Sequence, residues 1–280
     1  MEEKKFDPLQ FIGFILIALI LTWMLYRNGP VEEQKSESKT TTEQSITSPS
    51  SPEESETSAA FIQQQKVESF GDLGALFKSN SIENISISTE NISYKVQSKG
   101  AQIVVLQLDK FENFADNPLR LISESNTDFN VKLTTLDGRV INTRDIFFTP
   151  TLTDQADSYK LLMTSSISTR QSIVFEYDFP KQGYLYTVNL KTKGMQTLLN
   201  SSSLPNFSWK TDAFRNSRSI DYENRYTEYT FGYEEDRVDY LSLNGEDKES
   251  REGIRWISYR QHFFSTILIP STPIASAELI

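Results

Sequence analysis

The sequence holds few residues of the types that perform acid–base or metal chemistry. His262 is the only histidine and cysteine is absent, so a metal site would need carboxylates alone and no thiolate nucleophile exists. His262 lies in the strand-like segment RQHFFSTILIP, residues 260–270, which favours a packed or surface imidazole over a catalyst. We therefore expect no catalytic residue, no metal and no cofactor.

Carboxylates and aromatic side chains offer the remaining chemistry. A glycoside hydrolase needs two carboxylates about 5 to 10 Å apart, but 38 acidic residues produce such pairs by chance, and Glu234, Glu235 and Asp236 suit a solvated loop. Nucleotide-binding and serine-hydrolase motifs are missing, so the sequence predicts a protein that is not an enzyme. Aromatic residues could stack sugars in a cleft, although cross-strand pairs in a β core are the favoured interpretation; they are Tyr222, Tyr226, Tyr229, Phe231, Tyr233 and Tyr240.

The charge balance excludes nucleic acid as a partner. The formal net charge is -10 and the isoelectric point is about 4.8, whereas binding to phosphate backbones requires a basic stripe. An acidic domain stays soluble and is repelled by anionic lipid.

An apolar segment near the N-terminus predicts a membrane anchor. FIGFILIALILTWMLY, residues 11–26, is apolar except for Gly13 and Thr22, and no small-x-small cleavage site follows it. Lys4 and Lys5 precede the segment, and Trp23 and Tyr26 fit the aromatic belt at the far interface. We expect a cytoplasmic N-terminus over residues 1–8, a transmembrane anchor over 9–27 and export of the remaining chain.

A polar tether and a long β domain follow the anchor. Residues 28–66 are dominated by Ser, Thr, Glu and Gln and predict a disordered linker. From residue 84 onward the apolar residues recur with a period of two, as in Phe129, Val131 and Leu133, which predicts strands. Further strands are expected at Tyr159–Thr164, Phe207–Lys210, Arg225–Tyr233, Arg237–Leu243, Gly253–Tyr259 and Gln261–Ile269, and a short helix at Glu68–Lys78.

The clearest hairpin covers residues 171–192. The side chains of Ile173, Phe175, Tyr177 and Phe179 should share one face, and Tyr184, Tyr186, Val188 and Leu190 one face of the return strand. In the turn PKQG, Pro180 would preset the backbone and Gly183 would take a positive φ. Many strands without helical crossovers predict a large antiparallel β-sandwich of two sheets over residues 67–280.

The segment WISYRQHFFSTILIP, residues 256–270, resembles the W-x-x-x-(K/R)-Q-x-(F/Y)-F block that closes the first periplasmic domain of the YidC insertase family. Trp256, Arg260, Gln261, Phe263 and Phe264 match that signature block. The order of anchor, tether and β domain also resembles the family, as does the stretch from Leu204 to Trp209 with its spacing Leu-Pro-x-Phe-x-Trp.

This resemblance implies a galactose-mutarotase-like supersandwich in the periplasm, attached to the bacterial inner membrane. In the family, five transmembrane helices follow and hold the insertase groove with its functional arginine. The present sequence contains no second hydrophobic span, so it resembles an N-terminal portion without the insertase core, and no groove residue can be assigned. The implied partners are the Sec translocon, nascent inner-membrane proteins and the lipid bilayer.

A membrane-tethered, mutarotase-like protein that binds or processes carbohydrate is the alternative. Its cleft would be lined by Tyr, Trp and carboxylates and would take a glycan, or else a peptide. The single histidine counts against epimerase chemistry of the mutarotase type.

Overall fold

The computed structural model describes residues 64–78, 81–124, 126–242 and 248–280. All of them belong to one compact unit, residues 51–280. The predicted anchor with Trp23 and Tyr26, and the predicted linker as far as residue 63, lie outside the described residues. Within the described ranges, no helix combines the length and apolar character that crossing a membrane requires.

The described strands form four sheets, and every pairing between them is antiparallel. The first sheet has the order β1 (Asn84–Ser88), β2 (Ile92–Gln97), β3 (Gln102–Glu112), β4 (Pro118–Ile122). The second has the order β10 (Thr187–Lys193), β9 (Gln171–Pro180), β8 (Ser158–Ser168), β7 (Thr149–Asp154). The third has the order β11 (Asn206–Thr211), β5 (Thr127–Thr134), β6 (Val140–Asn142).

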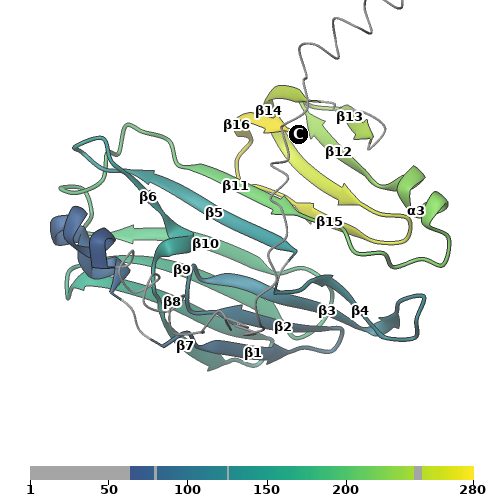
Figure 1. Ribbon diagram of the computed structural model, residues 1–280, viewed down its shortest axis with the longest axis horizontal. Coiled ribbons are helices and arrows are strands. Elements are labelled where there is room, and N and C mark those ends of the chain that lie inside the picture. Colours follow the sequence, from purple (N-terminus) through teal and green to yellow (C-terminus); the bar gives the residue numbers. More distant parts are fainter. Residues whose placement is uncertain (1–63, 79–80, 125, 243–247) are drawn as a thin grey trace, which may run out of the picture. The chain divides into compact units, whose positions relative to one another are not determined.

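The fourth sheet is built around one long strand, β14 (Glu249–Arg260). One edge of β14 pairs with β12 (Glu228–Tyr233), which in turn pairs with β13 (Arg237–Ser242). The other edge pairs with β16 (Ile274–Leu279) and then with β15 (Ser265–Leu268). Figure 1 shows β14 running through the middle of this sheet.

Helical structure is scarce. Residues 64–69 are α-helical and lead into the 3-10 helix η1 (Gly71–Phe77), so the predicted helix is present but mostly 3-10 in type. The predicted end of the linker at residue 66 falls inside this helical stretch. A second 3-10 turn is η2 (Thr143–Asp145), and α3 (Ile220–Tyr226) is a short α-helix that the sequence analysis did not expect.

The first three sheets and η1 share one hydrophobic core. Alternation places Ile173, Phe175, Tyr177 and Phe179 of β9 in it, as predicted, and each is almost fully buried. Phe179 packs on Tyr94 of the first sheet, with ring centroids 4.6 Å apart. The prediction of a mainly antiparallel β fold is confirmed, although the strands divide into four hydrogen-bonded sheets rather than two.

The fourth sheet has a small core of its own, made of Phe231, Ile254, Ile257 and Leu279. The described part of the chain therefore holds two separate clusters of buried apolar side chains. Burial of apolar surface is the main stabilising term in folding. The small cluster of the fourth sheet therefore contributes less to stability than the larger cluster.

The connection from β9 to β10 is longer than the predicted turn. Pro180 is the last residue of β9 and pairs with Ser158, whereas β10 begins only at Thr187. Gly183 has φ +86°, the positive value that was expected of it. β10 lies at the sheet edge, which leaves Val188 exposed although it lies opposite Tyr177.

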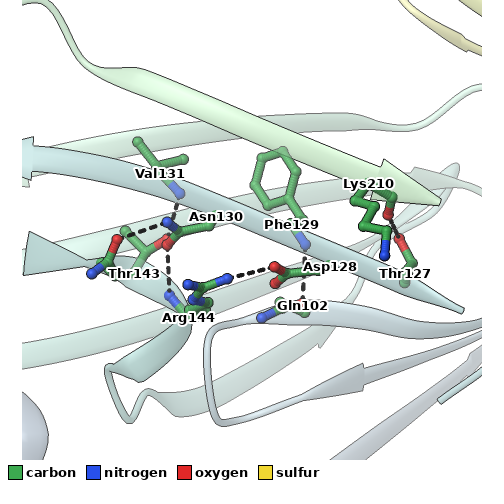
Figure 2. Close-up of polar contacts among 10 residues, drawn as sticks. Gln102, Thr127, Asp128, Phe129, Asn130, Val131, Thr143, Arg144 and Lys210 are labelled. Carbon is green, nitrogen blue, oxygen red and sulfur yellow. Dashed lines mark hydrogen bonds and ion pairs between the residues drawn. The ribbon is translucent and has the colours of Figure 1, made fainter. Parts of the chain in front are cut away.

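Where β6 does not pair with β5, polar side chains accept hydrogen bonds from backbone N–H groups of β5 (Figure 2). The backbone N–H of Val131 donates to Oγ1 of Thr143 at 2.9 Å, and that of Phe129 donates to Oε1 of Gln102 at 3.3 Å. Asn130, which lies between the alternating apolar residues Phe129 and Val131, is buried, and its amide donates to Asn142 and accepts from the backbone N–H of Arg144. Each of these backbone groups thus gains a partner away from water.

Two predicted strands are partly wrong. Over Arg225–Tyr233 the chain first completes α3 and becomes a strand only at Glu228. Over Gln261–Ile269 the residues 261–264 form a turn, and β15 spans only Ser265–Leu268. The backbone N–H of Gln261 donates to the carbonyl of Phe264 at 2.8 Å, which closes this turn.

Candidate functional site

The signature block lies at the end of β14 and in the turn that follows. Trp256 and Arg260 belong to β14, whereas Gln261, Phe263 and Phe264 belong to the turn. Together with residues 212–227 and the connection between β3 and β4 (residues 113–117), this turn forms a region that we call the junction. The contacts of each block residue show what it does there.

Trp256 covers a glycine on the neighbouring strand. It lies opposite Gly232 of β12, and a Cβ placed on Gly232 would come within 2.2 Å of the indole Nε1. The indole therefore occupies the space that any other side chain at position 232 would need. An aromatic ring over a strand glycine also restores packing that the glycine lacks.

Arg260 forms a cross-strand ion pair. Its Nη1 lies 2.8 Å from Oε1 of Glu228, the residue opposite it on β12. The Glu228 side chain is only 17% exposed, whereas the Arg260 side chain is 47% exposed. The guanidinium thus neutralises a carboxylate at the start of β12.

Gln261 links the turn to the segment that precedes α3. It is buried, its Nε2 donates to the carbonyl of Phe214 at 2.7 Å, and its Oε1 accepts from Nδ2 of Asn216 at 3.4 Å. Leaving a buried amide without such hydrogen-bond partners lowers the stability of the folded state. The glutamine of the block is therefore a structural clamp in this protein.

Glu223 of α3 holds the same segment from inside. Its carboxylate accepts the backbone N–H of Asn216 at 2.8 and 3.0 Å and that of Ser217 at 3.2 Å, and the side chain is buried. Hydrogen bonds from several backbone N–H groups stabilise an ionised carboxylate. The helix begins at the cap Ser219, whose side chain accepts from the N–H of Tyr222.

The junction also touches the first sheet and its loop. The rings of Phe264 and Phe111 meet edge to face with centroids 5.5 Å apart, and Phe264 packs against the larger core. The guanidinium of Arg215 lies over Phe114 at 4.3 Å, and the N–H of Phe114 donates to the carbonyl of Asn216 at 3.0 Å. The block therefore ties the fourth sheet to the main core.

His262 lies within an aromatic stack. Its ring is 5.0 Å from Tyr226 and 6.1 Å from Tyr222, nearly parallel to both, and 3.9 Å from Phe263. Its buried Nδ1 has no hydrogen-bond partner among the described residues. The imidazole is thus packed among aromatic rings, one of the two placements, packed or at the surface, that the sequence predicted.

Apolar side chains are exposed on α3 and on the turn. Ile220 and Tyr222 are each 51% exposed and Phe263 is 69% exposed. Exposed apolar side chains that gather in one region mark surfaces for interaction with other molecules. The junction therefore presents apolar side chains at its surface.

The described residues contain no cluster of three or more His, Asp or Glu side chains that could hold a metal ion. Among the described residues, burial raises the pKa of several tyrosines, most strongly those of Tyr177 and Tyr94. Burial raises the pKa of Tyr186 to about 12, and burial, followed by the nearby charges of Tyr229 and Asp212, raises that of Tyr259 to about 12. Tyr186 packs against Phe179 and Tyr94 at the larger core. Tyr229 and Tyr259 form the kind of cross-strand aromatic pair expected, 5.1 Å apart.

The sequence analysis missed Glu223, Asn216 and Arg215. A signal was present in SIDYENRY, residues 219–226, where a serine cap precedes two acidic residues in the first turn and an arginine follows in the last turn. The apolar spacing of this short segment does not stand out, because only seven residues are helical.

Comparison with known proteins agrees with the family resemblance of the signature block. The family model described as the YidC periplasmic domain matches residues 84–279. The chain is 26% identical over 276 residues to the membrane protein insertase YidC of Porphyromonas gingivalis, covering 94% of this chain and 43% of that protein. The corresponding protein of Parabacteroides distasonis is 25% identical over 282 residues, with 94% and 44% covered.

The membrane protein insertase YidC of Bacteroides fragilis is 27% identical over 271 residues, with 94% of this chain and 43% of that protein covered. The chain thus spans less than half the length of the curated relatives it matches. Since the family model matches most of the β domain and the relatives match nearly the whole chain, this chain belongs to the YidC family through its periplasmic domain.

Proposed function

We propose that this chain is the N-terminal part of a YidC-type membrane protein insertase and supplies its anchor and its periplasmic interaction domain. The family match over residues 84–279 carries the proposal. Relatives named as membrane protein insertases are more than twice as long as the matched region, so the insertase core would be encoded outside it.

In this proposal, residues 9–27 cross the inner membrane with residues 1–8 in the cytoplasm, and the β domain lies in the periplasm. The domain contacts nascent inner-membrane proteins, with and without the Sec translocon, and helps them to insert, fold and assemble. Insertion makes and breaks no covalent bond, and the domain needs contact surfaces rather than catalytic groups for this task. The exposed side chains of Ile220, Tyr222 and Phe263 are candidates for such contacts.

Sequencing and complementation test the first part of the proposal. The reading frame beyond codon 280 should encode several apolar spans, and the complete gene should restore growth to a bacterium depleted of its own YidC. A frame that ends at codon 280 and fails to complement would contradict it.

Photo-crosslinking in the complete protein tests the contact role. A photoreactive residue at Phe263 or Tyr222 should crosslink to ribosome-bound nascent chains of an inner-membrane protein. The matched control is Leu152 on β7, which is 44% exposed but lies outside the junction. Equal crosslinking at all three positions, or none at any, would refute a contact role for the junction.

A further inference from the structure

A cavity lies within the junction, and none of the signature-block residues lines it. It is formed by the connection between β3 and β4, by β4 itself and by residues 214–216, with a volume of about 450 Å³. That volume is within the range of small-molecule sites, roughly 300–1,000 Å³.

The walls of the cavity are fixed by hydrogen bonds. On one side, Oδ1 of Asn113 accepts the backbone N–H of Ala115 at 2.9 Å and that of Asn117 at 3.2 Å. On the other side, the carbonyl of Asn216 accepts the N–H of Phe114 at 3.0 Å, which joins the two walls. The cavity is therefore held by backbone contacts as well as by side chains.

Two arginines line the cavity, and neither pairs with a carboxylate within the described ranges. Arg120 donates through Nε to Oε1 of Gln107 at 3.3 Å. Arg215 donates through Nε to the carbonyl of Ser217 and through Nη2 to that of Arg218. Among the described residues, neither Nη atom of Arg120 nor Nη1 of Arg215 has a hydrogen-bond partner.

The remaining lining adds more donors and no carboxylate. Asn113, Asn117 and Ser123 contribute two amides and a hydroxyl, and no Asp or Glu lines the cavity. The acidic groups nearby are already engaged: Glu223 accepts backbone N–H groups from behind residues 216 and 217, and Asp109 accepts from Gln107. The cavity therefore carries the positive charge of two arginines and no lining carboxylate, next to the apolar side chains of Pro118 and Phe214.

We propose that this cavity binds a small anion, whose phosphate or carboxylate group is held by Arg120 and Arg215 and whose polar remainder contacts Asn117 and Ser123. The guanidinium fork matches the geometry of both oxyanions and forms strong, charge-assisted hydrogen bonds with them. The local charge is the reverse of the net charge of -10 carried by the chain, so general attraction of anions to the protein would not explain such binding.

Calorimetric titration of the full 280-residue chain, reconstituted in detergent-free nanodiscs of uncharged phosphatidylcholine, tests the proposal. Glycerol 3-phosphate and citrate serve as soluble probes, and vesicles containing phosphatidylglycerol present a phosphate in a lipid headgroup. We expect saturable binding of at least one probe with a Kd of about 1 mM or tighter. Binding of the soluble probes indicates a free ligand, whereas binding of vesicles alone indicates the headgroup.

Variants locate the binding. Arg120→Gln and Arg215→Gln should each weaken it by about tenfold or more, whereas Arg170→Gln, the same charge change at the exposed turn between β8 and β9, should not. Arg215 also supports its own loop, so Asn117→Asp is a second test. The Asn117 side chain has no hydrogen-bond partner among the described residues, and the new carboxylate would repel an anion. No binding of any probe, or equal binding by all variants, would overturn the proposal.

Discussion

At the scale of single residues, Glu223 shows how a charge can stabilise a fold without taking part in catalysis. It is the charged side chain that is buried among the described residues, and three contacts with two backbone N–H groups replace its water. The same contacts fix the segment that carries Phe214 and Asn216, to which Gln261 is bonded. The glutamine of the signature block thus depends on a residue that lies outside the block.

Replacing Glu223 by glutamine should destabilise the protein. The amide presents a hydrogen-bond donor where the carboxylate presented only acceptors, so a buried N–H group loses its partner, at a cost of about 1–3 kcal/mol. Urea unfolding followed by tryptophan fluorescence measures the change in the free energy of unfolding. The control Glu235→Gln, in the exposed turn between β12 and β13, should change it little; an equal effect of both substitutions would contradict the role given to Glu223.

Buried tyrosines should make the protein sensitive to alkali. The pKa of Tyr186 is raised by burial to about 12 in the folded state, against about 10 in the unfolded chain. Between pH 10 and 12 the folded state therefore keeps a proton that the unfolded state loses. The contribution of Tyr186 to the free energy of unfolding is complete below pH 10 and falls as the pH rises toward 12. The fall is at most about 1.4 kcal/mol per pH unit. Tyr186→Phe should reduce this alkaline loss in urea unfolding curves, whereas Tyr240→Phe at an exposed position of β13 should not; identical pH profiles would refute this cause.

At the scale of elements, the pairing of β12 with β14 depends on the match between Gly232 and Trp256. Gly232→Ala should destabilise the fourth sheet by about 1–3 kcal/mol, because the new methyl group overlaps the indole. Gly232 does not need a positive φ, so the effect is one of packing. In the Trp256→Ala background the same substitution should cost clearly less, and a double-mutant cycle measures the difference. Additive effects would show that the two residues do not interact.

Element type was predictable from the sequence wherever apolar residues alternate without interruption. Ile173 to Phe179 have the burial that their alternation predicts, because one face of β9 is covered and the other is not. The prediction was wrong where tertiary contacts decide, as at residues 261–264. There the hydrogen bonds of Gln261 and the packing of Phe264 accompany a turn in place of the predicted strand. The burial of Asn130 was not predicted, since a sequence cannot show that Asn142 and Arg144 would meet its amide.

The candidate site was predictable only as a motif. The five block residues were found because their spacing resembles the family, but their partners come from distant parts of the chain: Gly232 for Trp256, Glu228 for Arg260, Phe214 for Gln261 and Phe111 for Phe264. Phe263 alone is mainly exposed. The block is thus chiefly structural in this chain, with one residue available for contact.

At the scale of the whole β domain, two cores of unequal size are joined through the junction. The larger cluster includes side chains from the first three sheets and η1, whereas the fourth sheet buries only Phe231, Ile254, Ile257 and Leu279 in its own cluster. Regions with fewer buried apolar contacts open at lower free energy than the rest of a protein. The fourth sheet is therefore expected to open first, and the clamp at Gln261 and the packing of Phe264 limit how far it opens independently.

Hydrogen exchange measured by mass spectrometry tests this order of stability. Backbone amides of β12 and β14 should exchange faster than those of β8 and β9. Phe231→Ala removes a fully buried ring at a cost of about 3–5 kcal/mol. This substitution should accelerate exchange in the fourth sheet alone. The matched substitution Phe175→Ala in β9 removes an equally buried ring from the larger core and should accelerate exchange in β8 and β9. If Phe231→Ala raised exchange equally in all four sheets, the domain would open as one unit. The junction would then couple the two cores so tightly that neither opens alone.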